Sequence, residues 1–122
     1  NYNLDSATTQ QILFLAAGRP LLIRQLAENP NKFAEYRQLA TDAKQILATN
    51  QEYTTLKNIA KYFTDRQKAL MLTDIIINMI RFQSLSHGMN STLEKQLDQT
   101  TIVSKALSSN ANVRLALMQL VL

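Results

Sequence analysis

Glycine and proline, the residues that most often break regular structure, are scarce in this chain. Only two of each occur among 122 residues. A β-sandwich or β-barrel requires many tight turns, which draw heavily on these two residue types. Apolar residues instead recur at spacings of three and four, the period of an amphipathic helix. The sequence therefore predicts an all-α fold, a bundle of about six or seven helices.

The few breakers stand where one predicted helix gives way to the next. Gly18, Arg19 and Pro20 separate two apolar runs. Glycine ends a helix without a Cβ penalty, and proline is tolerated in a first turn because its missing N–H has no partner to lose. Asn29-Pro30 repeats the same stop and restart. Two closely spaced helix–helix joints are therefore expected near the N-terminus.

The remaining boundaries follow from capping residues, which accept hydrogen bonds from the first free N–H groups of a helix. Gly88 is expected to end the most apolar helix, in which the stretch 69–82 is apolar nearly all round and so belongs at the centre of the bundle. The predicted helices cover residues 6–17, 21–28, 31–49, 51–63, 65–86, 91–107 and 113–122. The predicted N-caps are Ser6, Asn50, Thr64, Ser91, and Asn110 or Asn112.

Side chains with catalytic potential are few. Cysteine is absent, which excludes disulfides, thiolate metal sites and cysteine nucleophiles. His87, the only histidine, precedes Gly88 and fits a helix C-terminus better than a catalytic base. Glu94 and Asp98 are four residues apart but have no third ligand nearby. No glycine-rich phosphate loop occurs. We therefore expect no enzyme activity, no metal, no cofactor and no small-molecule ligand.

The most apolar run, ALMLTDIIINMIRF, is short for a membrane span and contains Asp74, Asn78 and Arg81. Asp74 must be paired or must face water. The first ten residues lack the basic and apolar regions of a secretory signal. We therefore expect a buried core helix, no membrane association and a cytoplasmic protein.

A mild basic excess leaves nucleic-acid binding open. The net charge is +4, from 13 Lys and Arg against 9 Asp and Glu. Four cations interleave with aromatic residues in one segment, a pattern that can contact phosphates and stack on bases. Because Tyr62 and Phe63 also fall at core spacing, a solvated face is the competing interpretation. The candidate weak nucleic-acid face, here called the basic face, comprises Lys57, Lys61, Arg66 and Lys68.

Two motifs at opposite ends of the chain resemble one family. The stretch LFLAAGRPLLIRQLAENP resembles the end of the AAA+ lid of bacterial DNA polymerase III clamp-loader subunits, where a helix ends in glycine and a proline-started helix follows. The closing stretch SSNANVRLALMQLVL resembles the last helix of their collar domain. ATPase members carry a sensor arginine where this chain has Leu21, so the resemblance is greater to the delta-prime type than to the gamma/tau type.

This resemblance implies that the chain contains two regions with different roles. Residues 1–29 would be the end of the lid, and residues 30–122 the collar, which joins subunits into the ring that loads the sliding clamp. The implied partners are the delta and gamma/tau subunits, with DNA nearby but weakly bound. The last helix is either core or interface, and the candidate interface residues are Arg114, Leu117, Leu120 and Val121, with Leu115 next to Arg114.

Overall fold

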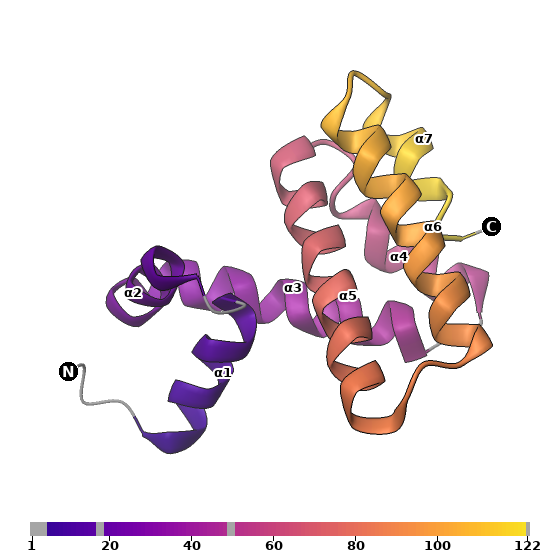
Figure 1. Ribbon diagram of the computed structural model, residues 1–122. Helices are drawn as coiled ribbons and strands as arrows, with labels where there is room; N and C mark the ends of the chain where they lie inside the picture. The colour runs from indigo at the N-terminus through magenta and orange to yellow at the C-terminus, as the bar shows by residue number, and fades with distance from the viewer. Residues whose placement is uncertain (1–4, 17–18, 49–50, 122) are drawn as a thin grey trace. The chain divides into compact units, whose positions relative to one another are not determined.

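The computed structural model describes residues 5–16, 19–48 and 51–121. The predicted all-α fold is confirmed, because these residues form seven α-helices and no strand (Figure 1). The helices are α1 (Ser6–Ala16), α2 (Pro20–Glu28), α3 (Pro30–Ala48), α4 (Glu52–Ala60), α5 (Arg66–His87), α6 (Ser91–Ser108) and α7 (Val113–Met118).

The chain divides into two compact units, an N-terminal unit of residues 1–40 and a C-terminal unit of residues 41–122. The division falls within α3, which contributes its first part to one unit and its last part to the other. The domain boundary predicted between residues 29 and 30 lies at the start of α3 and stays a prediction.

The N-terminal unit brings α1 against α2. Ile12, Leu15, Leu22 and Leu26 are among its buried side chains, and their three-and-four spacing puts each pair on one helix face. Removing these aliphatic side chains from water is the main force that holds the two short helices together.

Both predicted joints of this unit coincide with helix starts. Pro20 opens α2, and the backbone of Arg19 before it is extended, while Gly18 lies outside the described residues. The Arg19 Nε group donates a hydrogen bond to the Ala16 carbonyl at 3.2 Å. At the second joint the Asn29 side chain accepts from the N–H groups of residues 31 and 32, at 3.1 and 3.2 Å.

The C-terminal unit is built around α5, which packs against α6 and α7 (Figure 1). Seven side chains of α5 are buried, as its all-round apolar pattern predicts: Ala69, Leu72, Thr73, Ile75, Ile76, Met79 and Ile80. Gly88 ends the helix with a φ of 79°, a backbone conformation that residues with a Cβ rarely adopt. α6 then returns along α5, so the two form a helical hairpin.

Three N-caps differ by one residue from those predicted. Asp5, Asp65 and Asn90 accept the capping hydrogen bonds of α1, α5 and α6, in place of Ser6, Thr64 and Ser91. In each case an Asx residue adjoins the predicted serine or threonine and takes the capping position. Asn112 caps α7, as one of the two predicted alternatives, and Asn50 lies outside the described residues.

Candidate functional site

The last helix is shorter than expected and is partly core. α7 ends at Met118, and turns continue from there to residue 121. It contacts α4, α5 and α6, and Leu117 has no exposed surface. The prediction that Leu117 belongs to a subunit interface is therefore corrected, because this side chain fills the core of the C-terminal unit. Leu120 and Val121 are half-buried.

The outward side of α7 consists of two adjacent residues. Arg114 is exposed, and its guanidinium carbon lies 5.6 Å from the centre of the Phe63 ring, a cation–π distance. Leu115, next to it, is 67% exposed. The sequence places Leu115 and the buried Leu117 together on the candidate face, but two residues apart in a helix they point to different sides.

Other large apolar side chains are exposed on the same unit. Ile102 on α6, which packs against α7, is 62% exposed. Phe82 and Leu85, three residues apart on one face of α5, are 56% and 87% exposed. Large apolar side chains at this exposure leave apolar area in water that a partner could cover.

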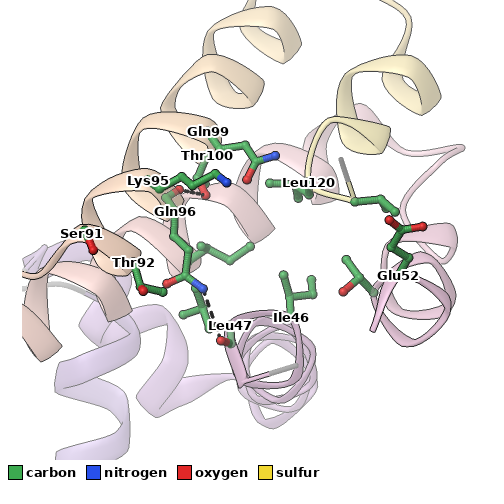
Figure 2. A pocket seen from close by; sticks show the side chains of 13 residues that line it. Ile46, Leu47, Glu52, Ser91, Thr92, Lys95, Gln96, Gln99, Thr100 and Leu120 are labelled. Carbon is green, nitrogen blue, oxygen red and sulfur yellow. Dashed lines mark hydrogen bonds between the residues drawn. The ribbon is translucent and has the colours of Figure 1, made fainter. Parts of the chain in front are cut away.

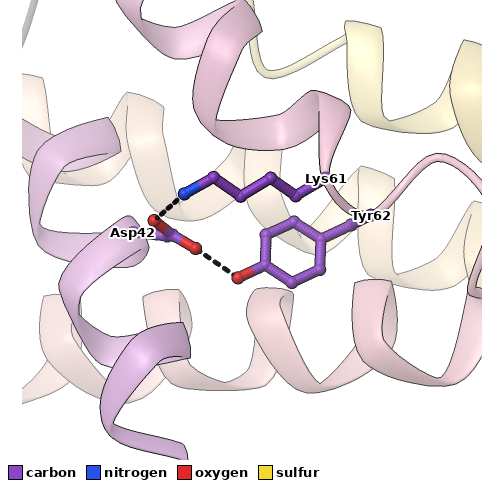
Figure 3. Close-up of polar contacts among 3 residues, drawn as sticks. All are labelled: Asp42, Lys61 and Tyr62. Atoms are coloured by element: carbon purple, nitrogen blue, oxygen red, sulfur yellow. Dashed lines mark hydrogen bonds and ion pairs between the residues drawn. The ribbon is translucent and has the colours of Figure 1, made fainter. Parts of the chain in front are cut away.

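Lys61, one of the four cations of the basic face, is engaged within the chain. The Lys61 ammonium lies 3.0 Å from Asp42 Oδ1, and the Tyr62 hydroxyl donates to Asp42 Oδ2 (Figure 3). Asp42 is only 1% exposed, so this pair of donors compensates a carboxylate that has lost its water. Sequence reasoning missed Asp42, whose position among the apolar residues of α3 was the available signal.

Arg66, a second engaged cation of the basic face, joins the start of α5 to the end of α6. Its guanidinium donates to the carbonyl groups of Leu107 and Ser109, at 2.7 and 3.0 Å, and to that of Ala111. These carbonyls lie at the end of α6 and in the turn that follows, where the helix leaves acceptors without backbone partners. Lys57 and Lys68 are exposed and complete the basic face.

A groove of about 560 Å³ opens between the end of α3, the start of α4, α6 and the turn after α7 (Figure 2). Lys95 and Gln96 of α6 line one side, Glu52 of α4 lies across from them, and Leu120 borders the opening. The Gln96 amide donates to the Leu47 carbonyl at 3.3 Å and so connects α6 to the end of α3. The groove is wide enough for a small molecule.

Two other titratable residues singled out in the sequence lie on the surface of α5. His87 is exposed at the end of α5, and Asp74 is exposed on the outer side of that helix. Within residues 5–16, 19–48 and 51–121, no three His, Asp or Glu side chains are grouped as metal ligands. None of the described helices is both long enough and apolar enough to cross a bilayer.

Comparisons with known proteins found no relative of this chain. No protein-family model, no curated protein and no solved structure matches the chain.

Proposed function

We propose that this chain is a non-catalytic assembly module of a bacterial DNA polymerase III clamp loader, most similar to its delta-prime subunit. Support comes from the two end motifs, which occur in the order of the lid and the collar within an all-α chain. Residues 1–29 correspond to the end of the lid and residues 30–122 to the collar. The delta and gamma/tau subunits are the proposed partners, in the cytoplasm.

The observation that carries the assembly role is the exposed apolar surface of α6 and α7. Ile102 and Leu115 come from two helices in contact, and both are more than half exposed. Arg114 adds a guanidinium beside Leu115, and interfaces are rich in arginine as well as in apolar side chains. Covering such residues removes apolar area from water, which stabilises a permanent assembly.

The position of Leu21 supports a subunit that does not hydrolyse ATP. It stands where the resemblance places the sensor arginine of the ATPase members, and an aliphatic side chain cannot bind phosphate. Leu21 is 67% exposed at the start of α2, so burial in its own unit does not account for it.

The test is co-purification from the native organism, using the full-length parent protein with and without residues 30–122. We expect the other clamp-loader subunits to appear only when this segment is present. If none appears in either case, the proposal is wrong.

A double variant tests whether the exposed residues of α6 and α7 form the subunit interface. Ile102→Asp with Leu115→Asp should abolish co-purification while circular dichroism shows unchanged helicity. Gln67→Asp, an exposed polar position in the first turn of α5, adds negative charge elsewhere and should leave the complex intact. Equal loss in the control variant would count against an interface on α6 and α7.

The alternative is a small basic domain that binds nucleic acid. It has weaker support, because Lys61 and Arg66 already hold partners within the chain. If the chain is an assembly module, Lys57→Glu with Lys68→Glu should leave any DNA retention unchanged at modest salt. A strong, salt-dependent affinity that this double variant removes would favour the alternative instead.

A further inference from the structure

The groove beside α6 contains two opposite charges that do not neutralise each other. Glu52 on α4 and Lys95 on α6 lie on opposite sides of its opening (Figure 2). Each is exposed, and within the described chain neither side chain forms an ion pair or a hydrogen bond. A site with this arrangement attracts a carboxylate at one end and an ammonium at the other.

A hydroxyl group on the groove wall supplies a second feature. Thr55 lines the groove from α4, and its Oγ1 atom pairs with no acceptor or donor among the described residues. This hydroxyl is therefore available as a donor to a molecule in the groove. One turn further along the same helix, outside the groove lining, Asn58 Nδ2 is buried without a partner.

The rest of the lining is neutral and held in place. Gln96 and Gln99 of α6 donate through their side-chain amides to the carbonyls of Leu47 and Gln119. These bonds orient each carboxamide and leave its oxygen as an acceptor. Ile46, Leu120 and Val121 add aliphatic surface next to them.

We propose that this groove binds a zwitterionic small molecule whose two charges stand at opposite ends, as in a short peptide with free termini. The peptide carboxylate pairs with Lys95 and its terminal ammonium with Glu52. Thr55 donates to a peptide carbonyl, and an aliphatic side chain packs against Leu120 and Val121. A simple anion fits less well because Glu52 repels it, and a simple cation because Lys95 does. Such binding is separate from the assembly role.

The probe is the tripeptide Gly-Leu-Gly, titrated into the full chain and followed by amide chemical shifts. Acetylating its amino group or amidating its carboxyl group should each weaken binding about fivefold, the effect of losing one solvent-exposed charge pair. In Glu52→Gln the free and acetylated peptides should bind equally. In Lys95→Gln the free and amidated peptides should bind equally, because each substitution removes the partner of the blocked group.

Two matched variants serve as controls. Glu94→Gln and Lys105→Gln change exposed charges of α6 outside the groove and should leave every affinity as in the unmodified chain. The proposal is overturned if Gly-Leu-Gly does not bind, if the blocked peptides bind as well as the free one, or if the controls lose as much as Glu52→Gln. Because the titration uses this chain alone, its result is independent of whether clamp-loader subunits co-purify.

Discussion

At the scale of single residues, Asp42 shows how a carboxylate is kept inside a helical core. It loses nearly all of its water, and a phenol hydroxyl and an ammonium group replace those hydrogen bonds. The two donors differ in environment. Tyr62 is buried with the carboxylate, whereas the side chain of Lys61 is 49% exposed. Removing the buried donor should therefore be the more damaging change.

Tyr62→Phe should lower the free energy of unfolding by about 1–2 kcal/mol, because it leaves one oxygen of Asp42 without its donor. Lys61→Met should cost less than about 1 kcal/mol, since water screens the half-exposed ammonium. Lys57→Met, one turn earlier and exposed, serves as the control and should change stability little. Urea denaturation measures all three. A larger loss in Lys61→Met than in Tyr62→Phe would contradict this account.

Asp5 gives a pH-dependent prediction at the N-terminus of α1. Hydrogen bonds from the side chain and the backbone N–H of Thr8 lower the pKa of Asp5 from its ordinary value of 3.8. The folded state therefore favours the ionised carboxylate, and its stabilising effect is present above pH 3.8 and lost as the pH falls through the lowered pKa. The helicity of α1 should decrease over this range, measured by NMR shifts of residues 6–9. Asp5→Asn should abolish that dependence.

At the scale of elements, Arg66 connects the first turn of α5 to the last turn of α6. A planar guanidinium directs several N–H groups at once, and here they reach three backbone carbonyls. A lysine at the same position carries the charge but lacks this fork.

Arg66→Lys should therefore lower the free energy of unfolding by about 1–2 kcal/mol, even though the net charge is unchanged. Lys68→Arg, two residues along the same helix and exposed, is the reciprocal exchange and should have little effect. Chemical denaturation of both variants provides the comparison. Equal stability of Arg66→Lys and the unmodified chain would show that charge alone suffices.

Two leucines of α7 should respond in opposite ways to the same substitution. Leu117→Asp introduces a carboxylate where the side chain has no exposed surface, and should cost more than about 3 kcal/mol. Leu115→Asp places it in water and should leave the thermal midpoint nearly unchanged. If Leu115→Asp unfolds the chain and Leu117→Asp does not, then Leu115 and not Leu117 is the side chain that α7 buries.

Element types and approximate bounds were predictable, because apolar period, proline and asparagine act within a few residues. The confirmed features include the helix boundaries at the Arg19-Pro20 and Asn29-Pro30 joints and the end of α5 at Gly88. The side chains that meet across the fold were not predictable. Leu115 and Leu117 are equally apolar, and only packing against α4, α5 and α6 decides which is buried. Likewise, nothing local to Lys61 indicates a partner in α3.

At the scale of the whole molecule, the two compact units differ in how much apolar core stabilises them. The C-terminal unit buries apolar side chains from α4, α5, α6 and α7, including Ile59, Leu72, Val103 and Leu117. The N-terminal unit has only 40 residues, about the size below which chains rarely fold without a metal, disulfide or partner.

A fragment of residues 30–122, which keeps α3 whole, should thus unfold cooperatively on heating. A fragment of residues 1–40 should show no cooperative transition. Calorimetry of both fragments checks this. A sharp transition in the shorter fragment would require a source of stability beyond its buried leucines and isoleucine.

The Arg66 bonds also bear on the order in which the C-terminal unit folds. They join residues 41 and 45 positions apart, at the end of the α5–α6 hairpin that is farthest from Gly88. Contacts near Gly88 close short loops and form early, whereas this distant end closes a long loop and forms late. Arg66→Lys should therefore accelerate unfolding while leaving the refolding rate nearly unchanged, so this arginine determines how long the folded unit persists.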